Sequence, residues 1–529
     1  MNIIEISSEC SGLAQRGGLG SVIWGISDAF RRMGHKTTII LPYYAEIKHD
    51  VHFATTVNVF FGGDEMPVSV FETNHLGIRV LLIHSDRFYR GEYADVYIDS
   101  SKLQRGYFED DAKRFAFFSL AASQLLLHLQ NNEQLDAIHC HDWHTGLIPL
   151  LIKLHPAFYR LRAIPKLFTI HNLEYQGTRP LEAQGNLQGF LDWYTDLGHL
   201  EREIFAPYLD RHADIPCINP MRAALQTADN VTTVSPSYAR EICRPDDTAA
   251  GFFGGRGLEA DLADLHAHGR LIGITNGIDQ DFYDAEKLRH PYSHNNRTEG
   301  LKQNRAALLN EMPGIIDKLV NSGALIAHTE VALREKLQSI RHEEFLHQPL
   351  LVAVTRLTGQ KIQQFFETVE GLSVLEHLAA LPIHVIFLGK GDLLQFMCEQ
   401  TAAAAKILLF GGFDDELEKR LYAAADAMLM PSEFEPCGTS QMKAMRYGCL
   451  PIAAAVGGLN DTIRHGHNGF LYSGSSRQAK AAAFLSTIRE VLDLMHNDRE
   501  RILQMQRNAM LTDFSWSEAA QNYIRLFRG

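Results

Sequence analysis

Two cations lie five residues apart where a predicted strand gives way to a helix. Arg356 and Lys361 follow the apolar run PLLVAVT at 349–355. A guanidinium and an ammonium beside a helix N-terminus favour a diphosphate, because both charges and the helix dipole attract anions. The alternative is a pair of solvated surface charges. Their position at a strand end favours the phosphate interpretation.

A carboxylate follows another predicted strand. Glu435 lies in FEPCGTSQ (434–441), directly after the run AMLMPS at 427–432. A carboxylate beside an anion site suits sugar hydroxyls better than phosphate, because hydroxyls donate hydrogen bonds to it. The residues that open the next helix, and whose N–H groups could bind phosphate or hydroxyls, are Cys437, Gly438, Thr439 and Ser440.

Polar residues also end two strands of the N-terminal half. Asp142 follows the run DAIHCH at 136–141, and His171 with Asn172 follows KLFTI at 166–170. Asp142 could cap a helix or face a polar substrate. For His171 a structural histidine and a substrate-binding histidine stay open as alternatives. Ligands of doubly wound sheets bind beyond the carboxyl ends of the strands, which keeps all three residues as candidates.

Glycines open a helix after the first predicted strand. Gly17 and Gly18 follow NIIEIS at 2–7, and Arg16 precedes them. Glycine lets a ligand approach backbone N–H groups at the positive end of a helix, which suits phosphate. A simple glycine-rich turn is the alternative.

Three histidines within six residues raise the question of a metal. They are His139, His141 and His144, in HCHDWH. Their spacing does not suit a strand-to-helix turn that presents all three rings together, so we expect no metal site.

Length and composition favour a globular protein of two domains. The chain has 529 residues, of which 46% are hydrophobic and 21% charged. That length exceeds one ordinary core and fits two domains of roughly 250 residues. The formal net charge of −13 argues against binding to nucleic acid or an anionic membrane.

The N-terminus and the cysteines favour a cytoplasmic protein. MNIIEISSEC carries no basic segment followed by a long apolar one, so we expect no signal peptide, and no apolar run approaches the roughly 20 residues of a membrane span. The seven cysteines are scattered and include no CxxC pair, which indicates reduced thiols.

Apolar strands alternate with helical segments in two series. Such alternation predicts parallel sheets covered on both faces, here two Rossmann-like doubly wound domains facing a cleft. The first series of strands is 2–7, 37–42, 80–85, 136–141, 166–170, 230–235 and 271–277. The second is 349–355, 384–389, 406–412, 427–432 and 450–455, with helices near 361–380, 414–425 and 438–448. The stretch 280–348 is predicted to be a linker with helices.

Taken together, the motifs resemble bacterial glycogen and starch synthases, which are retaining glycosyltransferases of the GT-B architecture. The resemblance runs through most of the chain. It rests on segments in the family's order: SSECSGLAQRGGLGSV, HCHDWHTGLIPLLIK, LFTIHNLEYQG, GITNGID, RLTGQK, RLYAAADAMLMPSEFEPCGTSQMKAMRYG and GGLNDTI. The segment 514–527 resembles the family's closing helix. The implied domains are 1–280 on the acceptor side, 281–512 for the nucleotide sugar, and a helix at 513–529 that crosses back to the first domain.

The resemblance implies transfer of glucose from ADP-glucose to the 4-OH end of an α-1,4-glucan, with retention and without a metal or another cofactor. Arg356 and Lys361 would hold the diphosphate and stabilise the leaving group. His171, with Asn172, would lie at the glucosyl moiety. Glu435 would bind sugar hydroxyls or support the oxocarbenium-like state. Asp142 and Asn276 would line the sugar and acceptor side, with the glycine turn and 438–440 as backbone donors. The partners are then a nucleotide sugar and a glucan.

The chain departs from the family pattern at several places. The family's KTGGL is QRGGL here, so Gln15 stands where the family has a lysine near the nucleotide phosphates. RRTGGL has become AAVGGL, and insertions occur near 185–215 and 310–345. These departures leave open a different donor such as UDP-glucose, a different acceptor, or a non-catalytic relative that binds glucan or nucleotide sugar.

Overall fold

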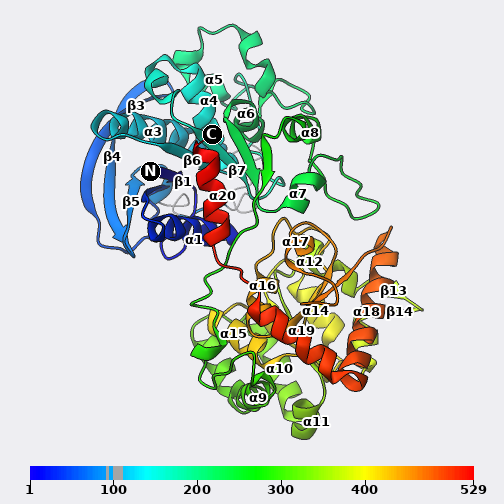
Figure 1. The fold of residues 1–529 in the computed structure, drawn as a ribbon. Helices are drawn as coiled ribbons and strands as arrows, with labels where there is room; N and C mark the ends of the chain where they lie inside the picture. Colours follow the sequence, from blue (N-terminus) through cyan, green and yellow to red (C-terminus); the bar gives the residue numbers. More distant parts are fainter. Residues whose placement is uncertain (91–94, 99–110, 529) are drawn as a thin grey trace. The chain divides into compact units, whose positions relative to one another are not determined.

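The computed structural model describes residues 1–90, 95–98 and 111–528, and the chain divides into two compact units (Figure 1). Unit 1 comprises Met1–Pro245, Gly254–Gly277 and Trp516–Gly529. Unit 2 comprises Asp246–Phe253 and Ile278–Ser515. The predicted boundary between the first two domains, at residue 280, lies close to the division at Gly277. The short segment Asp246–Phe253 falls within the predicted first domain but groups with unit 2.

The described residues of unit 1 form a nine-stranded sheet in the order β11-β10-β7-β6-β1-β2-β5-β4-β3. Neighbours from β11 to β5 are parallel, as predicted for buried apolar strands joined by helices. Their bounds are β1 Asn2–Ile6, β2 Lys36–Pro42, β5 Ile78–Ile83, β6 Ala137–His141, β7 Lys166–Ile170, β10 Asn230–Thr233 and β11 Leu271–Gly273.

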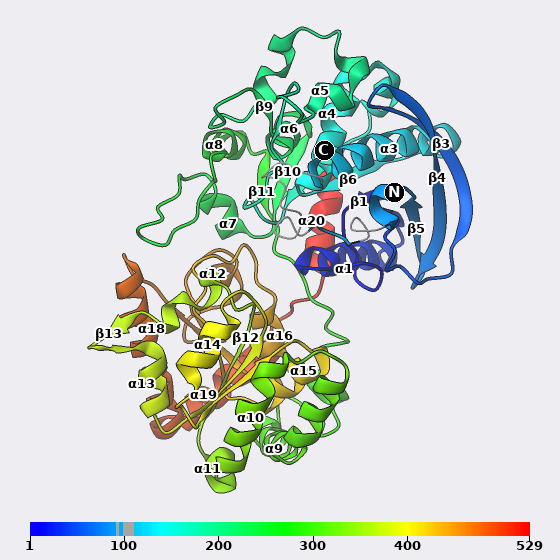
Figure 2. The ribbon, with the colours of Figure 1, turned by 180° about the vertical axis from the view of Figure 1, so that it is seen from behind.

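The antiparallel edge of this sheet is absent from the predicted strands. β3 (His52–Phe61) and β4 (Asp64–His75) form a hairpin beside β5 (Figure 2). Burial alternates in β3, where Val57 and Val59 are buried and their neighbours exposed. That alternation marks a half-buried antiparallel strand, which lacks the continuous apolar run that predicts a buried parallel strand.

Helices α1 (Gly18–Arg32) and α20 (Ser517–Arg528) pack together on the strands of unit 1. Phe30 of α1 and Tyr523 of α20 belong to one buried cluster with residues of β1, β6 and β7. Gly25 lets the two elements approach closely, because a Cβ there would lie 2.1 Å from the indole of Trp516. The other helices of unit 1 are α2 Asp86–Tyr89, α3 Asp111–Asn132, α4 Leu147–Leu154, α5 Phe190–Trp193, α6 Pro220–Thr227, α7 Pro236–Glu241 and α8 Glu259–Ala267.

Unit 2 has a six-stranded parallel sheet in the order β16-β15-β12-β17-β18-β19. The five predicted strands are present, and β19 adds an edge. The bounds are β12 Leu350–Val354, β15 His384–Gly389, β16 Ile407–Gly411, β17 Ala427–Met430, β18 Leu450–Ala454 and β19 Phe470–Tyr472.

The helix predicted over 361–380 is wrong in its middle. The chain forms α12 (Gly359–Ile362), then a hairpin of β13 (Thr368–Val369) and β14 (Leu372–Ser373), then α13 (Val374–Ala380). The hairpin turns at Glu370 and Gly371, whose φ angles are 52° and 89°. Two successive left-handed residues suit a two-residue hairpin and end a right-handed helix.

The remaining helices of unit 2 include those expected within 280–348. These are α9 Arg297–Asn321, α10 Ala327–Ser339 and α11 His342–His347. The others are α14 Leu394–Thr401, α15 Asp415–Ala424, α16 Ser440–Arg446, α17 Leu459–Thr462, α18 Arg477–Asn497 and α19 Arg499–Leu511. In the part of the chain that the structure describes, no helix is long and apolar enough to cross a bilayer. All seven cysteines are free thiols.

Candidate active site

In unit 1 the structure brings Asp142, His171 and Asn172 together. β6 and β7 are parallel neighbours, so their carboxyl ends meet at one edge of the sheet. Oδ1 of Asp142 accepts hydrogen bonds from the backbone N–H groups of His171 (2.7 Å) and Asn172 (3.3 Å). Asp142 has φ 54° and ψ 176°, a strained backbone for a residue with a Cβ. Strain of this kind persists where the surrounding structure imposes it, often at functional sites.

The Asp142 carboxyl group titrates near neutral pH. Burial raises its pKa to about 7, against the hydrogen bonds from the two backbone N–H groups, which lower it. A buried carboxyl that changes charge near pH 7 is a candidate for a functional role.

The imidazole of His171 is within hydrogen-bond distance of a second histidine, His141. Nε2 of His171 lies 3.0 Å from Nδ1 of His141, and Nε2 of His141 lies 2.7 Å from Oε2 of Glu5. Burial, together with the neighbouring histidines, lowers the pKa of His171 well below its usual range. Sequence reasoning missed Glu5 and missed His141 in this role. A carboxylate inside the otherwise apolar first strand was the signal.

The three histidines of HCHDWH separate into two groups. His139 and His141 lie beside Glu5, with donor atoms of the three residues within 4.8 Å of one another, close enough for one metal ion. His144 points elsewhere, against Phe115 and Tyr97, with ring centroids 4.6 and 5.1 Å away. Each of Glu5, His139 and His141 makes hydrogen bonds with protein groups.

The glycine turn binds a carboxylate of the chain itself. Oε2 of Glu9 accepts hydrogen bonds from the N–H groups of Arg16 (2.7 Å) and Gly17 (2.9 Å), at the start of α1. The hydroxyl of Tyr97 donates to the other oxygen of Glu9. Gly18 is exposed, and a Cβ there would meet nothing within 4 Å. Glu9 therefore shapes the turn and takes up two of its donors, a role that sequence reasoning did not assign.

Of the two polar side chains that precede the glycine turn, Gln15 is neutral and Arg16 is already paired. The guanidinium of Arg16 forms ion pairs with Glu46 (2.6 Å) and Asp95 (3.1 Å). The amide of Gln15 donates to Gly17 O and to the hydroxyl of Ser21. The charge that Arg16 offers to a phosphate is thus already shared with two carboxylates.

Asn276 lies beyond the end of β11, in unit 1. It is 7% exposed, and its Oδ1 is buried with no hydrogen-bond partner in the described structure. A buried amide oxygen without a donor is costly unless a ligand or water supplies one. Asn276 therefore remains a candidate for binding a hydroxyl.

In unit 2 the cations at the end of β12 differ in environment. Arg356 is exposed, and its side chain makes no hydrogen bond or ion pair with the described residues. Lys361 is 7% exposed, and its Nζ donates to Phe434 O (2.8 Å) and to Oε2 of Glu435 (2.6 Å). β12 and β17 are parallel neighbours, which is why the two strand ends meet.

The loop 432–441 is fixed by further contacts around Glu435. The hydroxyl of Ser432 donates to Oε2 of Glu435 (3.2 Å), and Glu435 O accepts from Gly458 N (3.1 Å). Gln441 is fully buried, and its amide donates to Cys437 O, Gly438 O and the hydroxyl of Thr462.

Small residues let this loop turn tightly. Gly438 has φ 70°, a conformation that favours glycine. Cys437 is buried, whereas Thr439 and Ser440 are half-buried at the start of α16. Gly438 lies beside Glu435, since a Cβ on Gly438 would be 3.0 Å from Cγ of Glu435. The contacts of Ser432, Gln441 and Gly458 were not predicted.

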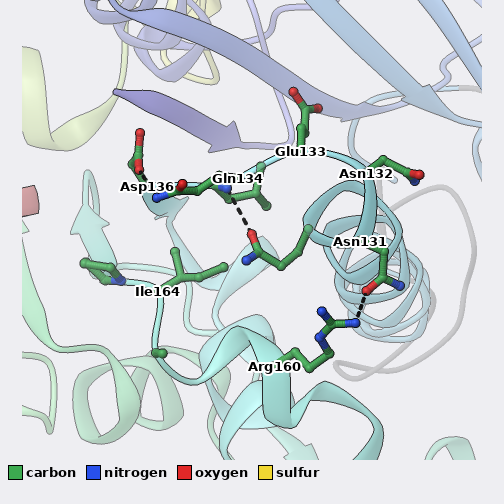
Figure 3. A pocket seen from close by; sticks show the side chains of 11 residues that line it. Asn131, Asn132, Glu133, Gln134, Asp136, Arg160 and Ile164 are labelled. Carbon is green, nitrogen blue, oxygen red and sulfur yellow. Dashed lines mark hydrogen bonds between the residues drawn. The ribbon is translucent and has the colours of Figure 1, made fainter.

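A pocket of about 660 Å³ lies at the other edge of the sheet of unit 1 (Figure 3). It is lined by 130–136, which precede β6, and by Arg160 and 163–165, which precede β7. Its polar side chains are partly paired with one another, as Arg160 is with Asn131. Because the candidate residues lie at the carboxyl ends of these strands, this pocket is separate from them.

Two family models match the chain. The model described as "Starch synthase catalytic domain" matches residues 2–264, and "Glycosyl transferases group 1" matches residues 337–508. The first covers the strands that carry Asp142 and His171. The second covers those that carry Arg356, Lys361 and Glu435.

Curated relatives are similar along the whole chain. A glycogen synthase of Streptococcus mutans is 34% identical over 541 residues, covering 100% of this chain and 99% of the relative. A glycogen synthase of Thermodesulfovibrio yellowstonii is 31% identical, covering 100% and 98%.

Solved structures show the same architecture. The catalytic domain of starch synthase IV from Arabidopsis thaliana, bound to ADP and acarbose, is 28% identical with a TM-score of 0.75, covering 100% of this chain and 98% of that chain. A sucrose-phosphate synthase from Thermosynechococcus elongatus is 15% identical with a TM-score of 0.55, at the same coverage. The latter supports the fold alone, which is the two-domain α/β arrangement of the GT-B type.

Proposed function

Because the chain belongs to the glycogen synthase family of glycosyltransferases, we propose that it transfers glucose from ADP-glucose to the non-reducing 4-OH of an α-1,4-glucan with retention of configuration. The observation that carries the proposal is the group at the end of β12. There Arg356, whose guanidinium is exposed and has no partner among the described residues, precedes the buried ion pair between Lys361 and Glu435.

Loss of a nucleoside diphosphate leaves negative charge on the phosphates. Arg356 is a cation that can meet that charge, and a guanidinium can bind two phosphate oxygens at once. Lys361 adds a positive charge that Glu435 partly neutralises, in a site where fixed charges act strongly because water is partly excluded. Glu435 keeps one oxygen for sugar hydroxyls while the other accepts from Lys361 and Ser432.

Unit 1 would serve the sugar and the acceptor. His171 and Asn172 would bind the glucosyl group, and Asp142 and Asn276 the hydroxyls around it. The orphan Oδ1 of Asn276 supports this role because it lacks a donor in the described protein. The glycine turn would contribute the exposed backbone at Gly18. No metal or other cofactor takes part in this proposal, and we expect the protein to act in the cytoplasm, where reduced cysteines persist.

A second candidate function follows from the glycine turn. Gln15 is neutral and Arg16 is already paired with two carboxylates, so the turn adds little positive charge for the phosphates. This favours a relative that binds glucan or nucleotide sugar without catalysis, and it leaves open another donor, such as UDP-glucose, or another acceptor.

The test is turnover with defined donors. Purified protein is incubated with glycogen or maltooligosaccharide and either ADP-glucose or UDP-glucose, without added metal, and released nucleoside diphosphate and chain length are measured. We expect extension with ADP-glucose. Extension with UDP-glucose alone would keep the reaction and change the donor. Binding of ADP-glucose or glucan with no extension by either donor would support the non-catalytic function.

A further inference from the structure

A buried chain of three side chains leads from the first strand of unit 1 to His171. Glu5 of β1 is fully buried, and His141 at the end of β6 is 1% exposed. The distances are 2.7 Å from Glu5 Oε2 to His141 Nε2, and 3.0 Å from His141 Nδ1 to His171 Nε2. Only the last member is partly exposed. The chain therefore connects a buried carboxylate to the candidate sugar-binding histidine.

The charges along the chain decide where the protons lie. Burial alone would raise the pKa of Glu5, but His139 and His141 outweigh it and lower the pKa to about 2, so Glu5 is ionised and can only accept hydrogen bonds. Burial and the neighbouring His139 lower the pKa of His141 to about 4, so His141 is neutral and carries a single ring proton near pH 7.

The single proton of His141 must then lie on Nε2, because Glu5 accepts there. Its Nδ1 is left as an acceptor, and the nearest donor to it is Nε2 of His171. In a neutral imidazole, the nitrogen that carries the proton is set by the hydrogen bond that it makes. The proton of His171 is thereby held on Nε2, and its Nδ1 is left as a lone pair with no hydrogen bond to the described residues.

We propose that Glu5 is a positioning residue which, through His141, holds the proton of His171 on Nε2 and so presents Nδ1 as a hydrogen-bond acceptor for a hydroxyl of the bound sugar. The sugar as ligand rests on the proposed function, whereas the order of protons rests on the contacts alone. Without Glu5 the proton of His171 would be free to move to Nδ1, which would turn an acceptor into a donor. A sugar hydroxyl can donate to Nδ1 or accept from it. If Nδ1 carried the proton, the hydroxyl would have to accept there, and its own proton would point away from His171.

A second branch from Glu5 supplies the control. Oε1 of Glu5 lies 3.1 Å from Nδ1 of His139, whose Nε2 lies 2.7 Å from the hydroxyl of Thr169. That hydroxyl lies 2.6 Å from the hydroxyl of Thr232, where both threonines are fully buried. This branch ends inside the sheet and does not reach His171. Thr232→Val therefore removes a buried hydroxyl of the same network without touching His141.

The first experiment reads the proton positions directly. The protein is labelled with ¹⁵N-histidine, and the His171 signals are identified by their loss in a His171→Gln variant. Long-range ¹H–¹⁵N correlation spectra at pH 7, without substrate, distinguish the two neutral tautomers and the imidazolium. We expect His171 as the Nε2–H tautomer. An Nδ1–H tautomer or an imidazolium would overturn the proposal, whatever the behaviour of any variant.

The second experiment removes the carboxylate. Glu5→Met keeps the length of the side chain but accepts no hydrogen bond. The Nε2–H of His141 then has no acceptor at this position, so the proton of His141 is no longer held on Nε2. We expect a loss of the Nε2–H form of His171 and a fall in kcat of tenfold or more, with KM for the donor changed by less than about threefold. Thr232→Val should retain both the tautomer and kcat.

Three results would contradict the proposed role of Glu5. They are an unchanged His171 tautomer in Glu5→Met, an equal loss of kcat in Thr232→Val, and stoichiometric zinc in the purified wild-type protein, which would make Glu5, His139 and His141 a metal site. Because the tautomer is read without substrate, an inactive wild-type protein would count against the proposed function and leave this test intact.

Discussion

The ammonium of Lys361, in the helix α12 that follows β12, lies 2.6 Å from Oε2 of Glu435, in the loop that follows β17. Both side chains are mostly buried, with 9% and 15% of their surfaces exposed. The pair joins two segments that are 74 residues apart in sequence. It places a cation and a carboxylate side by side at the edge of the sheet where Arg356 also lies.

Removing the cation of this pair should abolish most turnover. Lys361→Ala takes away a charge that stabilises the leaving group and leaves the mostly buried carboxylate of Glu435 without its ion-pair partner. We expect kcat to fall by about 10²-fold or more, in line with the loss of one charge-stabilising donor at an active site. Steady-state kinetics with the donor that supports turnover would measure this fall in kcat.

The matched control for Lys361→Ala is Lys406→Ala. Lys406 belongs to the same unit, precedes β16 at the opposite edge of the sheet, and pairs with Glu344 at 3.6 Å. The charge change is the same, so a general effect of net charge would appear in both variants. A similar loss of kcat in Lys406→Ala would remove the support for Lys361.

Gly457 should be required for the position of Glu435. A Cβ on Gly457 would lie 2.1 Å from Glu435 O, and its φ is 44°. Gly457→Ala should therefore displace the backbone of Glu435 and reduce kcat by at least tenfold. Gly466 also has a positive φ, 71°, but a Cβ there would meet nothing closer than 3.7 Å. Like Gly457→Ala, Gly466→Ala should lower the free energy of unfolding by about 1 kcal/mol through backbone strain, but it should keep its activity.

Thermal unfolding measured alongside kcat separates the two glycine effects. Both variants should unfold at a lower temperature than the wild type, because both place a side chain on left-handed backbone. Full activity in Gly457→Ala would show that the contact with Glu435 O does not position the carboxylate.

A lysine at position 15 should strengthen donor binding. Gln15 lies at the start of the glycine turn, where the neighbouring cation Arg16 is paired with Glu46 and Asp95. One added charge about 4 Å from a phosphate, with the full screening of bulk water, is worth about 1 kcal/mol. Gln15→Lys should therefore lower KM for the donor by roughly fivefold, and more so at low salt.

The control for this charge is Gln134→Lys. Gln134 lies in the pocket at the opposite edge of the same sheet. The Gln134→Lys variant should have an unchanged KM for the donor at every salt concentration. If KM also stays unchanged in Gln15→Lys, the glycine turn does not contact the phosphates of the donor.

Asp142 should make unit 1 less stable as the pH rises. Its pKa in the folded protein, about 7, lies above the ordinary value of 3.8. Between these values the folded state binds more protons than the unfolded state, so the free energy of unfolding falls as pH rises through this window. Between pH 5 and pH 7 the loss is on the order of 2–3 kcal/mol, after which it levels off.

Asp142→Asn isolates this effect. The amide oxygen of asparagine can still accept from the N–H groups of His171 and Asn172, but it does not titrate. The free energy of unfolding of the wild type minus that of the variant should fall between pH 5 and pH 8, as measured by urea unfolding. Glu5, with its lowered pKa, contributes below this range, and His141 contributes equally to both proteins. A constant difference would mean that Asp142 stays ionised throughout.

Local sequence alone determined much of the fold. Continuous apolar strands such as LLVAV and ILLFG are buried on both faces in parallel sheets, and their composition is enough to recognise them. The candidates at strand ends followed from the same rule, since a parallel sheet brings the carboxyl ends of its strands to one edge. The strand β3 and the hairpin turn at Gly371 were not predicted. Their signals are alternating burial and left-handed backbone, and neither produces a continuous apolar run.

Only the tertiary structure decided which groups meet. Glu5 and His141 are 136 residues apart, and Lys361 and Glu435 are 74 apart, so no local pattern connects them. Arg16 reads as a free cation in the sequence, yet it is paired with Glu46, 30 residues away. The reason is physical: the order of strands in a sheet brings distant side chains within hydrogen-bond distance. Burial and partners then set which of them carry charge, hold a proton or remain free for a substrate.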